Sequence, residues 1–193
     1  MMNDDREMSR ARAIAGSFVF LLAAPGVVAG LIPWLLTGWE AHPWWPPLRV
    51  LGGLMICAGL LVLLEAFIRF ALEGIGTPAP VAPTERLVVG GAYRYVRNPM
   101  YLAVAALIVG QALLLGRSTL FVYAAVVGVA VAAFVHGYEE PALAHRFGAQ
   151  YEDYRRAVPA WWPRLTPWDR RSRTGRARAA GSGRRRDNAG CAP

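Results

Sequence analysis

One segment of the chain, residues 90–101, carries the residue types and spacing that could do chemistry. It reads Gly-Gly-Ala-Tyr-Arg-Tyr-Val-Arg-Asn-Pro-Met-Tyr and stands directly before a long apolar run. Its tyrosines offer aromatic faces to a cation or a flat base. Arg94 and Arg97 offer planar forks to a carboxylate. The segment therefore suits a small charged ligand held at the edge of an apolar region.

The carboxylate pair Glu139-Glu140 closes a later apolar run and can complete that site. The two runs between Tyr101 and Glu139 are joined by Gly116-Arg117-Ser118, which is too short for anything but an antiparallel hairpin. At about 1.5 Å per residue, the depths of Tyr101 and Glu139 differ by only about 9 Å. We therefore expect both side chains near each other at one membrane boundary, where the carboxylates could hold an ammonium, a sulfonium or ribose hydroxyls.

The start of the helix after Asn98 offers a place for an anionic group. Pro99 suits a first helical turn, because its missing N–H costs nothing there, and the free N–H groups of that turn point beside Asn98. S-adenosylmethionine has an adenine, a ribose, a carboxylate, an ammonium and a sulfonium, so it fits these residue types together. A simpler alternative stays open, since Tyr and Arg also anchor helices at membrane interfaces.

Four apolar runs must position these residues. The chain is 55% hydrophobic over 193 residues, and the runs lie at 13–36, 48–64, 100–116 and 119–135. With its flanking residues, each run is long enough to cross a bilayer. We therefore predict an all-α integral membrane protein with about four transmembrane helices. A signal peptide is the alternative for the first run, although Pro25-Gly26 and Pro33 interrupt it.

Arginine placement predicts the topology. Arginines cluster before the first run, between the second and third runs, and after the fourth. We therefore expect a multi-pass protein of a bacterial cytoplasmic membrane with both termini in the cytosol. Residues 164–193 hold nine arginines against Asp169 and Asp187, which is +7 of the net +8. We expect this basic tail to be disordered and to lie against anionic lipid headgroups, with no nucleic acid as a partner.

A predicted amphipathic helix comes after Glu140, on the cytosolic side of the membrane. Apolar residues recur there at spacings of three and four: Leu143, Phe147, Tyr151, Tyr154 and Val158. Gly148 divides this helix, and residues 159–163 are expected to return to the interface. The domain organisation is then a cytosolic segment at 1–12, a membrane domain at 13–168 with a cofactor-site core at 85–163, and a tail at 169–193.

Charged residues at the end of the second apolar run leave two interpretations open. Glu65, Arg69 and Glu73 succeed one another at spacings of four, so they share one helical face and can pair. This face is either a solvated helix end or the polar wall of a cofactor pocket. The two cysteines, Cys57 and Cys191, predict no disulfide, and no metal-ligand spacing occurs in the sequence.

The chain resembles a known superfamily in two blocks. The segment at 87–101 looks like the core of the isoprenylcysteine carboxyl methyltransferase and phospholipid methyltransferase superfamily. Glu139-Glu140, Phe147-Gly148, Tyr151, Tyr154 and Val158-Pro159 occur in that superfamily's order and spacing. The resemblance covers roughly residues 85–163. It implies a membrane-embedded methyltransferase that uses S-adenosylmethionine, bound on the cytosolic side under the C-terminal helix, and methylates a lipidic or amphiphilic acceptor.

The resemblance also implies roles for individual residues. Glu139 takes the place of a carboxylate that faces substrate or cofactor, and serves as proton acceptor where the methyl acceptor is an amine. Glu140 stands beside it on the cofactor side, and His136 is a candidate for binding the substrate. The remaining cofactor contacts would be made by the backbone of Arg86, Leu87 and Val88 and by Tyr93, Arg97, Asn98, Pro99, Met100 and Tyr101.

Two departures from the prenylcysteine enzymes bear on the acceptor. Those enzymes have histidine where this chain has Asn98, and an arginine one turn before the glutamates where this chain has Val135 and His136. Recognition of a prenylcysteine carboxylate is therefore in doubt, although His136 could partly substitute. The alternatives to an isoprenylcysteine carboxyl methyltransferase-like enzyme are a phospholipid N-methyltransferase-like enzyme, a non-catalytic membrane protein that keeps the scaffold, and a membrane reductase related by fold.

Overall fold

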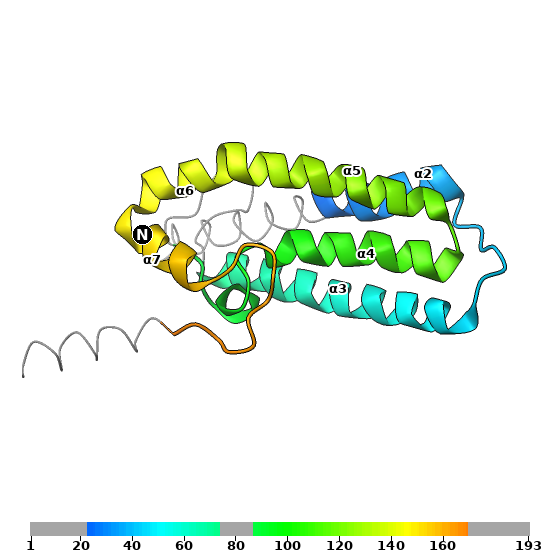
Figure 1. The fold of residues 1–193 in the computed structure, drawn as a ribbon, viewed down its shortest axis with the longest axis horizontal. Coiled ribbons are helices and arrows are strands. Elements are labelled where there is room, and N and C mark those ends of the chain that lie inside the picture. The colour runs from blue at the N-terminus through cyan, green and yellow to red at the C-terminus, as the bar shows by residue number, and fades with distance from the viewer. Residues whose placement is uncertain (1–22, 74–86, 170–193) are drawn as a thin grey trace, which may run out of the picture.

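The computed structural model describes residues 23–73 and 87–169, which form helices and contain no strand (Figure 1). Three long helices dominate: α3 (Pro46–Glu73), α4 (Pro99–Leu115) and α5 (Ser118–Phe134). Helix α4 packs against both α3 and α5. The remaining helical elements are η1 (Val27–Leu31), α2 (Ile32–Thr37), η2 (Gly91–Arg94), η3 (Val135–Glu139), α6 (Glu140–Phe147) and α7 (Ala149–Ala157). The predicted all-α class is confirmed for these two stretches.

Two helices of the described chain are long and apolar enough to cross a membrane, at Pro46–Arg69 and Ser118–Phe147. They contain the predicted runs 48–64 and 119–135. The other two apolar helices, Ala23–Thr37 and Pro99–Leu115, are shorter, so the predicted count of four spans is not established. Apolar side chains such as Leu61 and Val129 lie 69% and 71% exposed on the outer faces. Such surfaces suit a hydrocarbon environment better than water.

Glycines let α3 and α4 approach closely. A Cβ atom on Gly52 would lie 2.6 Å from the Gly110 carbonyl oxygen, and one on Gly59 would lie 2.9 Å from the Ala103 carbonyl oxygen. Small residues at helix contacts are typical of membrane proteins, where packing rather than the hydrophobic effect holds helices together. The contact continues into a cluster of Leu63, Phe67 and Ala103. This packing fixes α4, and with it the segment that opens α4.

A short turn joins α4 to α5, as the sequence predicts. Helix α4 ends at Leu115, and Gly116 caps it in the left-handed region at φ 66°. Arg117 then bridges to Glu40, with 3.0 Å between Nη2 and Oε2, while the His42 amide donates to the Leu115 carbonyl. The turn is therefore tied to the loop between α2 and α3, at the end of the bundle opposite α6 and α7 (Figure 1).

The first described helix, Ala23–Thr37, which contains η1 and α2, is held by polar side chains that reach its backbone. Pro33 has no N–H to offer the Ala29 carbonyl, and the helix widens into the π-helical turn η1. Gln111 Nε2 donates to that carbonyl at 2.7 Å, and the Tyr123 hydroxyl donates to the Val28 carbonyl at 2.8 Å. Because an unpaired carbonyl in hydrocarbon costs several kcal/mol, these bonds fix the first helix against α4 and α5.

The C-terminal helices form a compact layer instead of one straight amphipathic rod. Gly148, at φ 49°, separates α6 from α7, which confirms the predicted division. Tyr151, Tyr154 and Val158 are buried together. The partly buried residues packed against them are Leu87, Val89, Leu143, Ala144, Phe147, Ala157 and Trp168. The apolar stripe therefore faces the segment before η2 and holds that segment in place.

Residues 158–168, here called the C-terminal strap, run from α7 back along the segment that precedes α4 (Figure 1). Backbone hydrogen bonds join Arg97 N to Pro159 O at 2.9 Å, Arg164 N to Tyr95 O at 3.0 Å and Trp168 N to Arg94 O at 2.9 Å. The predicted segment 1–12 and the tail beyond residue 169 lie outside the described residues.

Candidate functional site

A cavity of about 360 Å³ lies where the first helix, the start of α4 and the α5–η3 junction meet. Its lining includes these sequence-predicted residues: Tyr93, Arg97, Asn98, Pro99, Met100, Tyr101 and Glu139. Apolar residues complete it: Ala24, Pro25, Val28, Leu63, Val104, Val127, Ala130 and Val131. One face of the cavity is therefore polar and aromatic, and the other is hydrocarbon.

The hairpin brings Tyr101 and Glu139 into contact, as the depth argument predicts. The Tyr101 hydroxyl donates to Glu139 Oε2 at 2.9 Å. Glu139 ends the π-helical turn η3, and Pro141 just beyond it has no N–H for the Gly137 carbonyl. A π-helical turn contains one extra residue, which changes the direction in which the later side chains of the helix point. Glu139 thereby faces the cavity, whereas Glu140 does not line it.

Glu140 pairs with Arg97 on the far side of the cavity wall. Arg97 Nη1 donates to Glu140 Oε1 at 2.7 Å and to the Tyr151 hydroxyl at 3.2 Å, and the two charged side chains are 12% and 8% exposed. Arg155 approaches Glu140 Oε2 at 3.5 Å. Among the described residues, the buried Nε of Arg97 has no hydrogen-bond partner. Glu140 thus positions an arginine whose side chain lines the cavity.

His136 lies apart from the cavity lining. Its Nδ1 is 3.4 Å from Glu140 Oε2, and its side chain is 60% exposed. Leu87 packs against the α7 cluster, and Val88 is buried with Ala66 and Tyr93, so neither of these side chains lines the cavity. The predicted backbone contacts of Leu87 and Val88 with a cofactor stay predictions. Arg86 lies outside the described residues.

Tyr93 and Asn98 connect the cavity to the C-terminal helices and strap. The Tyr154 hydroxyl donates to the Tyr93 carbonyl at 2.7 Å. Burial, followed by the neighbouring Tyr154 phenol, raises the pKa of Tyr93 well above its ordinary value, so its phenol stays neutral. Asn98 Nδ2 donates to the Ala160 carbonyl at 3.3 Å. Pro99 opens α4, as predicted, with the first free N–H groups of the helix beside the cavity.

A second, apolar space of about 320 Å³ adjoins the cavity between α4 and α5. The two spaces share Tyr101, Val104, Val127 and Val131. The outer part is lined by Leu102, Ala105, Gly128, Ala132 and Trp161. Sequence reasoning missed this space and the Ala24, Pro25 and Val28 wall. The interruption at Pro25-Gly26 was the only sequence signal that the first helix has an unusual face.

Glu65 and Arg69 form the predicted pair, with 2.9 Å between Glu65 Oε1 and Arg69 Nε. They line a separate cavity beside η2 and none of the cavity at Tyr101. The pair therefore does not form a wall of the predicted cofactor cavity, and both side chains are partly exposed near the end of α3. The side chain of Glu73 lies outside the described residues.

Comparison with known proteins connects this geometry to a family. A family model described as phospholipid methyltransferase matches residues 48–150, which is more than half of the chain. No curated protein and no solved structure matches the chain. The matched region includes nearly all of α3, the segment at 90–101, the hairpin and both glutamates. The chain belongs to the phospholipid methyltransferase family, part of the membrane methyltransferase superfamily that its sequence resembles.

Proposed function

We propose that this protein is an S-adenosylmethionine-dependent methyltransferase of the membrane that acts on a lipidic or amphiphilic acceptor. Family membership supports methyl transfer. The observation that carries the proposal is the Tyr101–Glu139 hydrogen bond in a cavity with one polar and one apolar face. Its volume of about 360 Å³ falls within the range of about 300–1,000 Å³ typical of small-molecule sites.

The polar face fits the cofactor's charged groups. The Nε of Arg97, which has no partner among the described residues, and the free N–H groups at the start of α4 are donors for a carboxylate. Tyr93 and Tyr101 offer aromatic surface, and Glu139 offers negative charge for a cation. S-adenosylmethionine, when bound, supplies a methyl group on a sulfonium. The protein's part is to hold an acceptor in line with that methyl group and to keep water away, which can contribute about 7–11 kcal/mol at best.

The apolar space between α4 and α5 suits the hydrocarbon part of the acceptor. It joins the cavity at Tyr101, so a chain lying along Val127 and Gly128 would end at the Tyr101–Glu139 pair. Where the acceptor is an amine, Glu139 accepts its proton, and the Tyr101 hydroxyl holds the carboxylate in place. A carboxylate acceptor needs no base.

A phospholipid amine is the second candidate acceptor, beside a prenylcysteine-like carboxylate. The family description names phospholipids. Of the arginines that could bind a substrate carboxylate, Arg155 is engaged with Glu140, and Arg97 pairs with Glu140 and is assigned above to the cofactor's carboxylate. This observation favours an amine at Glu139 over a carboxylate.

Calorimetric binding of S-adenosylmethionine to detergent-purified protein tests the cofactor half of the proposal. We expect measurable binding that weakens in a Tyr101→Ala, Glu139→Ala double variant. The matched control is Glu152→Ala on α7, which lies outside the cavity lining and should bind like the wild type. Absence of binding, or equal binding in the double variant, contradicts the proposal.

Turnover separates an enzyme from a non-catalytic scaffold. Transfer of a labelled methyl group should be measured with aminophospholipid, prenylthiol and small-amine acceptors. Consumption of the cofactor with only the lipidic acceptors is the expected result. Cofactor that binds but is never consumed favours the scaffold, and binding of a nicotinamide cofactor in its place favours a reductase.

A further inference from the structure

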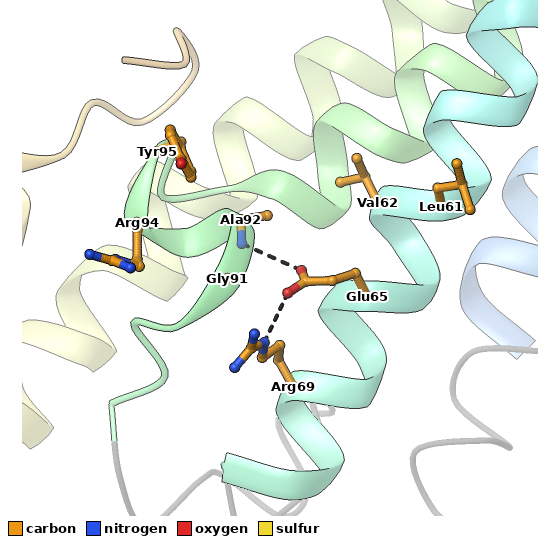
Figure 2. A pocket seen from close by; sticks show the side chains of 8 residues that line it. All are labelled: Leu61, Val62, Glu65, Arg69, Gly91, Ala92, Arg94 and Tyr95. Atoms are coloured by element: carbon orange, nitrogen blue, oxygen red, sulfur yellow. Dashed lines mark hydrogen bonds and ion pairs between the residues drawn. The ribbon is translucent and has the colours of Figure 1, made fainter. Parts of the chain in front are cut away.

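The separate cavity that Glu65 and Arg69 line has a volume of about 420 Å³ and lies between α3 and the 3-10 turn η2. None of its lining residues lines the cavity at Tyr101. Figure 2 shows Leu61, Val62, Glu65 and Arg69 along α3 on one side, and Arg94 on η2 with Tyr95 directly after it on the other; the Arg94 guanidinium points away from α3. Nothing in the proposed methyl transfer uses this cavity.

The lining changes from apolar to charged along α3. Leu61 and Val62 belong to the candidate span Pro46–Arg69, and Leu61 is 69% exposed. Glu65 and Arg69 come within the next two turns and are partly exposed. A bilayer shows the same order, from hydrocarbon to headgroup, over a similar depth. A ligand that fills the cavity therefore has an apolar part and a polar part.

The negative charge of Glu65 is used within the protein. Its Oε1 pairs with Arg69 Nε at 2.9 Å, and its Oε2 accepts from the Ala92 amide at 3.4 Å. Gly91 stands at φ +53°, and a Cβ there would overlap the Glu65 carboxylate. Glu65 thus anchors η2 to α3 and forms the back of the cavity.

Arg94 leaves a positive charge at the outer edge of the cavity. Its Nε donates to the Trp168 carbonyl at 2.8 Å, which is a neutral partner. No carboxylate in the described residues pairs with Arg94, and its terminal nitrogens have no protein partner there. Tyr95, beside it, is partly exposed, as interfacial tyrosines commonly are. A guanidinium with free donors at the edge of a cavity whose other side is apolar is suited to a phosphate group that carries hydrocarbon.

We propose that this cavity binds the phosphodiester headgroup of an anionic membrane phospholipid. The acyl chain lies along Leu61 and Val62, and the phosphate accepts hydrogen bonds from Arg94 beside Tyr95. This lipid is a bound partner and not the methyl acceptor. Since Arg94 is also bonded to Trp168 through both its Nε and its carbonyl, the lipid would rest against the end of the C-terminal strap.

Native mass spectrometry of the detergent-purified full chain tests the site by titration with phosphatidylglycerol and with phosphatidylcholine of the same chains. We expect one phosphatidylglycerol to bind more tightly than phosphatidylcholine. Arg94→Gln should weaken it about tenfold, which corresponds to about 1.4 kcal/mol. Arg146→Gln removes the same charge from an exposed position on α6 and should bind like the wild type. Equal binding by Arg94→Gln and wild type, or by the two lipids, overturns the proposal.

Two further arms identify the part of the lipid that is recognised. Leu61→Ala should weaken phosphatidylglycerol binding while leaving the fold intact, because this side chain is mostly exposed. Inorganic phosphate should bind far more weakly than the lipid, since it has no chain to lie on α3. Phosphate that binds as tightly as the lipid, with the same dependence on Arg94, overturns the lipid assignment. These readouts do not depend on methyl transfer.

Discussion

The Tyr101 hydroxyl donates a hydrogen bond to Glu139 across a hairpin, between residues 38 positions apart in the chain. The two side chains come from opposite arms of the hairpin, so the bond reports the register of α4 against α5. It also fixes one carboxylate oxygen at the wall of the cavity and leaves the other available to a ligand. The site therefore depends on the helix packing as much as on the residues themselves.

Removing that hydrogen bond should slow methyl transfer. In Tyr101→Phe, Glu139 loses a donor and is held less well. Because loss of a partner to a charged group costs about 1–3 kcal/mol, the rate should fall about tenfold to a hundredfold. The measurement is the initial rate of labelled methyl transfer to a lipid acceptor. Tyr138→Phe, one residue before Glu139 and exposed, is the matched control and should keep the wild-type rate. Equal rates in both variants would contradict the role of Tyr101.

Removing the charge of Glu140 should destabilise the protein more than removing the charge of the more exposed Glu152. Glu140→Gln leaves Arg97 without its nearly buried carboxylate, so we expect a loss of about 3 kcal/mol in the free energy of unfolding. Glu152→Gln removes the more exposed partner of Arg155 and should cost less than about 1 kcal/mol. Unfolding in mixed micelles measures both. A Glu140→Gln protein as stable as Glu152→Gln would show that the Arg97 pair is not structural.

Neighbouring glycines on α3 should respond oppositely to alanine. In Gly52→Ala the new methyl group meets backbone atoms of α4 at 2.6 Å, so the helices must move apart and stability should fall by about 1–3 kcal/mol. A Cβ on Gly53 meets nothing within 4 Å, and Gly53→Ala should be neutral or stabilising by up to about 1 kcal/mol. Thermal unfolding in detergent compares the pair. Similar effects at both positions would argue against the close α3–α4 contact.

Filling the apolar space at Gly128 should affect acceptors by chain length. A Cβ on Gly128 meets nothing within 4 Å, so Gly128→Leu should fold and occupy the space. We expect the KM for a long-chain acceptor to rise about tenfold or more, since about 1.4 kcal/mol of apolar contact is lost. Binding of S-adenosylmethionine should not change. Gly30→Leu, equally open but outside both spaces, is the control. An unchanged KM would place the acceptor chain elsewhere.

Alkaline pH should loosen the C-terminal layer. Burial raises the pKa of Tyr154 above its ordinary value near 10, so the folded protein keeps this phenol protonated where the unfolded chain has lost the proton. The stabilisation is complete below about pH 10 and is lost as pH rises toward the folded pKa. Tyr154→Phe should lose less stability between about pH 9 and 11 than the wild type. Tyr138→Phe, which removes an exposed phenol, is the matched control. The measurement is the free energy of unfolding of each protein across this pH range. An equal loss in Tyr154→Phe and the wild type would contradict the prediction.

The sequence alone predicts those features of the site that depend on counting residues along helices. The length of the apolar runs, the three-residue turn and Pro99 together predict that Tyr101 and Glu139 meet. The Arg97–Glu140 pair was not predictable in this way. The π-helical turn before Glu140 adds a residue, so helical spacing does not say which glutamate faces the cavity.

Long-range packing is the second limit on prediction from sequence. The Ala24, Pro25 and Val28 wall depends on where the first helix rests, and Gln111 and Tyr123 set that position through hydrogen bonds to carbonyls of the π-helical turn before Pro33. Ala and Val in such a wall look like any other lipid-facing residues. The assignment of Glu65 and Arg69 to a separate cavity likewise depends on which side of α3 meets η2.

The C-terminal strap gives this site an order of assembly. The Arg97 amide finds its partner only when Pro159 arrives, and the Asn98 side chain only when Ala160 does. During synthesis the helices of the hairpin are complete before either residue has been made. Two residues of the cavity wall, Arg97 and Asn98, therefore gain these hydrogen bonds only after the helices are complete, and a nascent chain that stops before residue 159 can hold its helices yet lack both bonds.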